Sequence, residues 1–296
     1  MKILVTGSSG LIGSQLVKDL VSEQHTVYSV YNNNTPVFGN PIKLDLTSDD
    51  IGKTISEIEP DCIVHLAAMT DIDRCENKKK VAESTNASVT KKIAKESALN
   101  GAYLCYLSTS YVFDGKIEYA TEDETDHKKP VNNYGLTKLL GENSVLDLVS
   151  PWSILRTDLI FGIHPTKRNF LTKVYNFLSN NKDLEVPVDQ FVSPTYLPNL
   201  TSMIMDVTTK QMTGIYHTAG TERISKYSLA ELFADKIGLD KKYLRPVSLS
   251  EKNYTATRPA DSSLDTSRAL SYLDSKPLPI EPSVDLFVRD LNQMAN

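Results

Sequence analysis

Residues 2–13 read KILVTGSSGLIG, a short apolar run followed by glycines spaced GxxGxxG, after which apolar residues recur at helical spacing. This order predicts a strand at Lys2–Thr6, a tight turn and a helix at Leu11–Val21. Glycines at such a junction let a phosphate reach backbone N–H groups at the helix N-terminus. A plain turn would also fit the string, but its place at the first strand–helix junction favours a dinucleotide site. The candidate contacts are Gly7, Gly10, Leu11, Ile12 and Gly13.

The following sequence continues this alternation of strands and helices. Runs rich in apolar residues predict strands at Thr26–Tyr31, Asp61–Ala68, Ala102–Ser108 and Trp152–Arg156, with helical stretches such as Ser84–Leu99 between them. Strands that are apolar on both faces are typical of a parallel sheet covered by helices. The pattern therefore predicts an α/β fold, a doubly wound parallel sheet of the Rossmann type.

The second half of the chain is less regular. We expect helices at Asn169–Leu178 and Ser228–Ile237, short strands at Phe191–Thr195 and Gly214–Ala219, and a solvated loop at Tyr119–Pro130. This pattern predicts that the chain folds into two parts. Residues 1–162, with a return segment near 186–219, are predicted to form an NAD(P)-binding Rossmann domain. Residues 163–185 and 220–296 are predicted to form a smaller C-terminal substrate-binding lobe.

Composition narrows the class of partner. The 296 residues are 40% hydrophobic with a net charge of -5, which argues against nucleic acid or an anionic membrane surface. The sequence has no signal peptide, and no apolar stretch approaches the roughly 18 residues of a membrane helix. The cysteines lack CxxC spacing, the histidines form no HExxH, and His65 in an apolar strand is interpreted as a core residue. We expect a cytoplasmic protein with reduced thiols, no metal site, and neither membrane nor nucleic acid as partner.

Two further motifs are suited to acid–base chemistry. Tyr134 and Lys138 are four residues apart in YGLTK, so on a helix they lie on one face. An ammonium beside the phenol is expected to favour phenolate and to lower the pKa of Tyr134. Such a tyrosine can donate a proton to a carbonyl oxygen while a hydride reaches the carbon. Ser108-Thr109-Ser110 ends an apolar strand, where a hydroxyl can hydrogen-bond the same carbonyl.

In this order and spacing, the glycine turn, the strand-end hydroxyls and YxxxK resemble the extended short-chain dehydrogenase/reductase family. Asp45-Leu46 is similar to the pair that packs on adenine in that family, and Leu66-Ala67-Ala68 to the turn beside the cofactor. Asn86 resembles the asparagine that supports the active-site helix. The resemblance implies an oxidoreductase that uses NADPH, with NADH as the other candidate. The implied cofactor contacts are Tyr31, Asp45, Leu46, Ala67, Ala68, Met69, Asn86, Leu107, Tyr134 and Lys138.

Within the family the chain is most similar to the dTDP-4-dehydrorhamnose reductases. The likeness is carried by strings such as AAMTDIDRCE at 67–76, STSYVFDG at 108–115, YGLTKLLGE at 134–142 and RPADSSLDTSR at 258–268. It implies reduction of a nucleotide-linked 4-keto-6-deoxysugar for polysaccharide biosynthesis, by a homodimer, with Thr109, Tyr134 and Lys138 as the catalytic trio. The candidate substrate contacts are Thr70, Ile72, Thr109, Ser110, Leu159, Asp189 and Arg258.

Three positions depart from the family pattern and keep alternatives open. Ser110 stands where the family often has Asp, Leu159 where it often has Trp at the rim of the cleft, and Tyr31 replaces an acidic residue that favours NAD. One alternative is an epimerase or dehydratase, although a dehydratase needs a carboxylate beside Thr109. The other is a non-catalytic NADP-bound regulatory subunit, although the intact trio argues against it. Arg258 with its neighbour Asp261 forms either a surface ion pair or contacts to the substrate's diphosphate and ribose.

Overall fold

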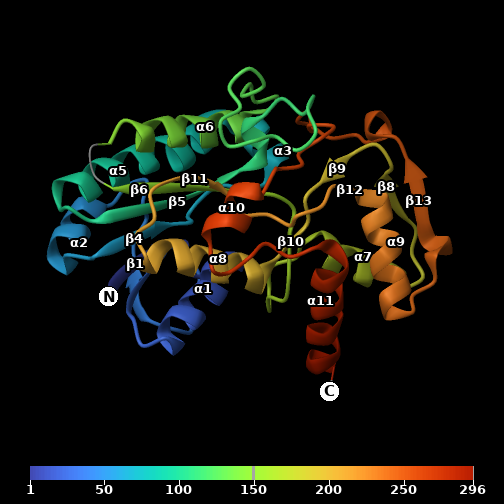
Figure 1. Cartoon of the computed structure of the whole chain (residues 1–296), viewed down its shortest axis with the longest axis horizontal. Coiled ribbons are helices and arrows are strands. Elements are labelled where there is room, and N and C mark those ends of the chain that lie inside the picture. Colours follow the sequence, from blue (N-terminus) through green and yellow to red (C-terminus); the bar gives the residue numbers. More distant parts are fainter. Residues whose placement is uncertain (149–150, 296) are drawn as a thin grey trace.

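The computed structural model describes residues 1–148 and 151–295. A seven-stranded parallel sheet forms the centre of the larger part, in the order β11-β6-β5-β4-β1-β2-β3 (Figure 1). This order, with crossovers between non-adjacent strands, confirms the predicted fold class. The strands are β1 (Lys2–Thr6), β2 (Thr26–Tyr31), β3 (Asn40–Lys43), β4 (Cys62–His65), β5 (Tyr103–Thr109), β6 (Trp152–Thr157) and β11 (Gly214–His217).

Helices cover both faces of the sheet (Figure 1). Helices α1 (Leu11–Ser22) and α8 (Leu197–Thr209) pack together on one face and share an apolar core with β1 and β5. Helices α2 (Ile51–Ile58), α5 (Val89–Leu99) and α6 (Asn133–Leu146) cover the other face. Because both faces are covered, β5 is apolar without alternation and all 7 of its residues are buried. Shorter helices are α3 (Ile72–Asn77), α4 (Lys79–Glu83) and α10 (Ser267–Tyr272).

The remaining elements form a smaller lobe, seen at the right of Figure 1. Helices α7 (Phe170–Leu178), α9 (Lys226–Ile237) and α11 (Ile280–Ala295) enclose an apolar core in which the Phe287 ring meets Phe161 edge-on and Phe233 at a tilt. Three pairs of short strands support this core. They are β8 (Leu184–Pro187) with β13 (Leu244–Val247), β9 (Phe191–Val192) with β12 (Ile224–Ser225), and β10 (Thr195–Tyr196) with β7 (Ile160–Phe161).

Two predicted segments differ from the structure. The strand expected at Phe191–Thr195 is two strands, β9 and β10, in separate pairings. They are separated because the Ser193 N–H donates to the Asp158 carboxylate at 2.8 Å instead of to a neighbouring strand. The loop Tyr119–Pro130 is not simply solvated. Its Glu122 is buried and accepts a hydrogen bond from the His217 N–H at 3.0 Å.

The segment expected to return to the sheet, 186–219, does so through α8 and β11, whereas β8 and β9 pair with strands of the lobe. The Rossmann and lobe boundaries themselves stay a prediction. Within residues 1–148 and 151–295, no helix has the length and apolar character needed to cross a bilayer.

Candidate functional site

The glycine turn brings bare backbone to the carboxyl end of β1. Gly7 has a φ of +69°, and a Cβ on it would lie 2.8 Å from the backbone nitrogen of Ala67. A Cβ on Gly13 would collide with the carbonyl of Gly7, whose oxygen accepts from the Gly10 N–H at 2.9 Å. Gly10 begins α1 without a capping side chain. The first N–H groups of α1 are therefore open to an anion, which fits the pyrophosphate of a dinucleotide.

A cleft of about 840 Å³ opens onto this turn. Strand ends and loops from both parts of the chain line it, including Lys167 and Arg168, which sequence reasoning did not select. Four predicted cofactor contacts do not line this cleft, so they could act on a cofactor there only through neighbouring residues. These four are Met69, Asn86, Leu107 and Lys138. The predicted contacts that line it are Gly7, Gly10, Leu11, Ile12, Gly13, Tyr31, Asp45, Leu46, Ala67, Ala68, Thr70 and Tyr134.

Local packing fixes Tyr134 at the start of α6. The Asn132 carboxamide caps the helix, accepting from the Gly135 N–H at 2.9 Å, and a Cβ on Gly135 would collide with the carbonyl of Tyr111. Burial raises the pKa of the Tyr134 phenol to about 12, against the smaller, opposite effect of a hydrogen bond with Thr109. Thr109 ends β5 and is itself buried. Tyr134 therefore lines the cleft, and Thr109, which is not among the lining residues, contacts it through a hydrogen bond.

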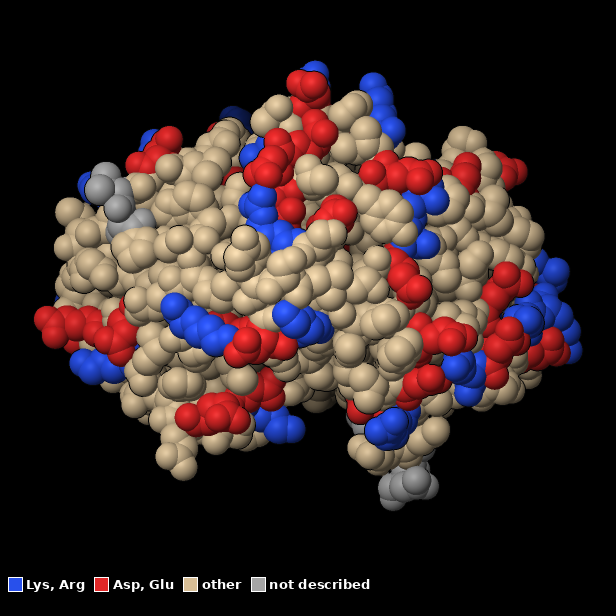
Figure 2. Space-filling view, in the orientation of Figure 1, with Lys and Arg blue, Asp and Glu red and all other residues tan. Residues whose placement is uncertain are grey.

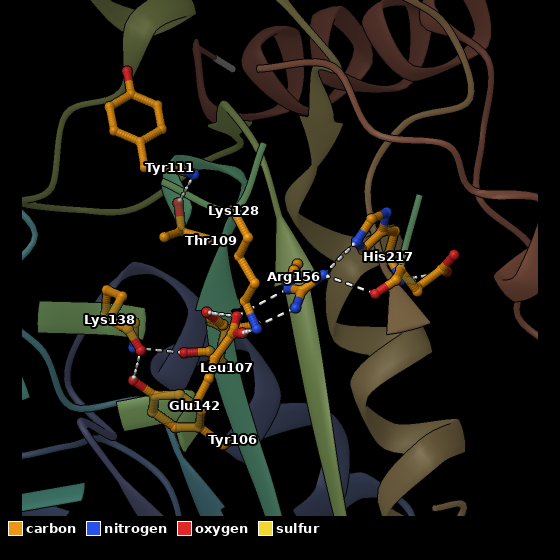
Figure 3. Close-up of polar contacts among 11 residues, drawn as sticks. Tyr106, Leu107, Thr109, Tyr111, Lys128, Lys138, Glu142, Arg156 and His217 are labelled. Atoms are coloured by element: carbon orange, nitrogen blue, oxygen red, sulfur yellow. Dashed lines mark hydrogen bonds and ion pairs between the residues drawn. The ribbon is translucent and has the colours of Figure 1, made fainter. Parts of the chain in front are cut away.

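Lys138 lies one turn further along α6 and is almost fully buried. Its ammonium donates to the Leu107 carbonyl at 2.7 Å and lies 4.1 Å from the centroid of the Tyr106 ring (Figure 3). Burial lowers the pKa of Lys138 to about 7, although the charge of Glu142 opposes this. The expectation that Lys138 lowers the pKa of Tyr134 is wrong here, because burial of the phenol dominates and raises it.

Asn86 connects two parts of the site from a π-helical turn, Ser84–Ser88. Its carboxamide oxygen accepts from the Met69 N–H at 2.7 Å, and its nitrogen donates to the Met69 carbonyl and to Thr137, each at 3.0 Å. Asn86 thus ties the turn after β4 to α6, between Tyr134 and Lys138. His65 is buried with both ring nitrogens in hydrogen bonds, to Thr6 and Thr90, which confirms its interpretation as a core residue.

Ser110, a predicted substrate contact, is paired inside the protein. Its hydroxyl donates to the Asp158 carboxylate at 2.8 Å, which also accepts from the Ser193 N–H at 2.8 Å and the Ser262 hydroxyl at 2.9 Å. Burial raises the pKa of Asp158 to about 6, although these hydrogen bonds act to lower it. Sequence reasoning found no carboxylate beside Thr109, but the following strand supplies one. Its partners lie 35 to 104 residues away, so no local pattern shows it.

The other predicted substrate contacts are dispersed. Arg258 does not pair with Asp261 but forms a bidentate contact with Asp73, 3.0 Å at both nitrogens. Leu159 is half-buried against the apolar core of the lobe and does not line the cleft as expected. Asp189 is exposed, and its carboxylate accepts from the Leu249 N–H at 2.6 Å. Ile72 opens α3 and is half-buried.

A second cleft, of about 310 Å³, lies in the lobe. Phe170 and Tyr254 give it aromatic walls, and Lys173 and Lys226 give it cations, whereas Lys252 is paired with Glu185 of the same lining at 2.8 Å. Burial lowers the pKa of Lys226 to about 8, although the charge of Asp158 opposes this. Rings and ammonium groups in one cleft suit a base linked to phosphates. Isolated lysines carry no local signal, which is why sequence reasoning missed them.

A buried ion network lies near Lys138 and Thr109 (Figure 3). Glu142 accepts from Arg156 through both carboxylate oxygens at 2.9 Å, from the Ser108 hydroxyl at 2.6 Å, and pairs with Lys128 at 2.9 Å. Burial tends to raise the pKa of Glu142, but Arg156 and these partners hold it at about 2. The network joins α6 to β5 and β6. No group of three or more His, Cys, Asp or Glu in the described part of the chain is arranged to hold a metal.

Residues 1–293 match the family model described as the RmlD substrate binding domain. The chain belongs to this family. It is 32% identical to the methionine adenosyltransferase 2 subunit beta of Mus musculus over 275 residues, which cover 90% of this chain and 81% of that protein. A probable low-salt glycan biosynthesis reductase of Haloferax volcanii is 28% identical over 272 residues, 90% of each.

Two solved structures of high similarity are dTDP-4-dehydrorhamnose reductases. A hypothetical dTDP-4-dehydrorhamnose reductase from Sulfolobus tokodaii has a TM-score of 0.85 at 36% identity, covering 95% of this RmlD-family chain and 98% of its own. A dTDP-4-dehydrorhamnose reductase from Bacillus anthracis, solved in complex with NADP, has a TM-score of 0.86 at 28% identity, covering 98% and 99%. Both the fold and the family suggested by the sequence are thereby confirmed.

Proposed function

We propose that this RmlD-family chain is an NAD(P)H-dependent reductase of a nucleotide-linked 4-keto-6-deoxysugar, with dTDP-4-dehydrorhamnose as the first candidate. The observation that carries the proposal is that Tyr134, hydrogen-bonded to Thr109, lines a cleft that begins at the glycine turn. Similarity to dTDP-4-dehydrorhamnose reductases over nearly the whole chain supports the choice of substrate class.

The residues present fit a dinucleotide. The turn from Gly7 to Gly13 would hold the pyrophosphate against open N–H groups, and Tyr31, Asp45 and Leu46 would line the adenosine end. When bound, the reduced nicotinamide supplies the hydride. Met69 and Asn86 would act indirectly, by fixing the turn that lines the cleft.

The chain itself supplies the proton. At neutral pH Tyr134, with a pKa of about 12, holds its proton and can donate it to the carbonyl oxygen as that oxygen becomes an alkoxide. The Thr109 hydroxyl can orient the same oxygen. Lys138, held by Leu107 behind β5, contributes charge near the phenol when protonated.

The substrate's nucleotide is assigned to the cleft in the lobe. Phe170 and Tyr254 can stack on a base, while Lys173 and Lys226 can neutralise a diphosphate. Arg258 stands beside Tyr254, 4.5 Å from its ring centroid, and Thr70 lines the larger cleft. The sugar would lie between the two clefts, near Thr109 and Ser110.

The likeness to methionine adenosyltransferase 2 subunit beta supports a second candidate, a non-catalytic subunit that binds NADP. The two candidates differ in turnover. We expect oxidation of NADPH when the chain is mixed with dTDP-, GDP- or UDP-linked 4-keto sugars, fastest with dTDP-4-dehydrorhamnose. Tight NADPH binding without turnover of any of these would instead favour the regulatory subunit.

We further propose that residues 1–162 with 186–219 act as the cofactor domain and that the rest acts as the substrate lobe. We also propose a cytoplasmic homodimer that serves polysaccharide biosynthesis. Light scattering on the purified chain tests the dimer, and a monomeric mass would overturn that part of the proposal.

A further inference from the structure

The loop between β7 and α7, residues 162–169, is held in a defined shape. The His164 ring nitrogen Nδ1 accepts from the backbone N–H of Thr166 at 3.1 Å and of Lys167 at 3.0 Å. At the other end, the Asn169 carboxamide donates to the Gly162 carbonyl at 2.6 Å and also caps α7. A Cβ on Gly162 would press on Leu197 of α8, so the base of the loop sits tightly on the larger part of the molecule.

This loop presents two cations to the larger cleft. Lys167 and Arg168 line it, both are exposed, and neither forms an ion pair with any carboxylate in residues 1–148 or 151–295. Arg74 of α3 adds a third cation to the same lining. The one acidic lining residue, Asp45, already accepts hydrogen bonds from the N–H and hydroxyl of Thr47, at 3.0 and 2.7 Å. In a chain with a net charge of -5, this cleft favours an anion.

The order of the strands in the sheet indicates which part of a bound dinucleotide the loop would face. Tyr31 is the last residue of β2, on one side of β1, whereas the 162–169 loop follows β6 and β7 on the other side. The glycine turn lies between them, at the end of β1. A dinucleotide whose pyrophosphate lies on that turn places its adenosine ribose toward Tyr31, away from the loop.

We propose that Lys167 and Arg168 form a clasp, reaching across from the lobe, that binds the pyrophosphate of the dinucleotide over the glycine turn. This rests on the proposed function only in requiring that the chain bind a nicotinamide dinucleotide. Since the pyrophosphate is common to NADPH and NADH, the clasp strengthens the binding of both and does not select between them. It also lets cofactor binding hold the lobe against the Rossmann part.

The test is equilibrium binding of NADPH, NADH and ADP-ribose, without sugar substrate, to the unmodified chain and to Lys167→Ala/Arg168→Ala. We expect the double variant to lose on the order of 100-fold in affinity for all three, since each of the two charge-assisted contacts is worth about one factor of ten. Binding of these ligands by the double variant should also depend less on salt concentration than binding by the unmodified chain. The control is Lys182→Ala, an exposed lysine of the same lobe outside both clefts, which should bind as the unmodified chain does.

Four outcomes overturn the clasp. Unchanged binding by the double variant would show that the two cations touch no phosphate. A loss confined to NADPH would place them on the 2′-phosphate. If the unmodified chain bound none of the three ligands, the proposed function would fail as well. Since both side chains are exposed and unpaired, the thermal unfolding midpoint without ligand should not change, which separates lost binding from lost folding. Lys167→Glu/Arg168→Glu should lose more affinity than the alanine variant, and equal losses would also contradict the proposal.

Discussion

Tyr134 and Lys138 lie four residues apart on α6, and burial shifts their pKa values in opposite directions, to about 12 and about 7. Each shift favours the neutral form, because a low-dielectric surrounding penalises charge. The neutral phenol is the form that a proton donor needs. The lysine is charged only below about pH 7, so the charge that it contributes near the phenol should be lost above that pH.

The raised pKa of Asp158 predicts how the stability of the fold depends on pH. Burial raises its pKa from 3.8 to about 6, so between these values the folded chain holds a proton that the unfolded chain has lost. The free energy of unfolding should therefore fall as pH rises through this window, by on the order of 3 kcal/mol from this group. We expect Asp158→Asn to remove that slope, as measured by urea unfolding from pH 4 to 6.

The matched control is Asp126→Asn, which changes an exposed carboxylate and should keep the slope. The neighbouring Lys226, with a pKa lowered by burial to about 8, stays protonated in this range, so the difference between the two variants reports Asp158. Equal slopes in both variants would show that Asp158 is ionised throughout.

Cofactor choice is also decided by single residues. Tyr31, Asn32 and Asn33 line the cleft after β2 and offer no carboxylate to repel a 2′-phosphate. We predict that kcat/KM with NADPH is at least equal to that with NADH, and that Tyr31→Asp shifts the ratio toward NADH. A preference of the unmodified chain for NADH by about 100-fold, or about 2.7 kcal/mol, would contradict this assignment.

At the scale of elements, the Glu142–Arg156 pair connects α6 with β6 inside the protein (Figure 3). Removing one partner leaves the other charge buried. We predict that Arg156→Met lowers the free energy of unfolding by about 3–5 kcal/mol. Glu142→Gln/Arg156→Met should cost less than the sum of the two single changes, because it removes both charges. Strictly additive losses in urea unfolding would show that the two side chains do not stabilise each other.

The elements also show what sequence can and cannot predict. β1 and β2 have the predicted bounds, because apolar and β-branched runs between turn residues are local signals. The motifs of the predicted catalytic trio and the glycine turn are equally local signals. The Asp158 cluster, the Lys226 cleft and the 162–169 loop depend on partners distant in the chain, which no spacing reveals. Leu159 was misplaced for the same reason, since its packing against the lobe core depends on tertiary structure.

At the scale of the whole molecule, contacts between the two parts converge on the site. Asn132 donates to the Thr257 carbonyl at 2.8 Å, Arg258 pairs with Asp73, and Asp158 accepts from Ser262. On the face drawn in Figure 2, acidic and basic side chains are interspersed and form no broad patch of one sign. Cations also line the two clefts, with Lys167 and Arg168 in the larger one and Lys173 and Lys226 in the smaller one.

The most direct test compares the unmodified chain with Tyr134→Phe in the reduction of dTDP-4-dehydrorhamnose, at NADPH concentrations that saturate both. The phenylalanine variant lacks only the proton donor, so it should bind NADPH normally and lose roughly 10²–10⁴-fold in kcat. Fluorescence titration of NADPH confirms equal binding. An unmodified chain that binds NADPH and turns over no 4-keto sugar, or a Tyr134→Phe variant with normal kcat, would contradict the account.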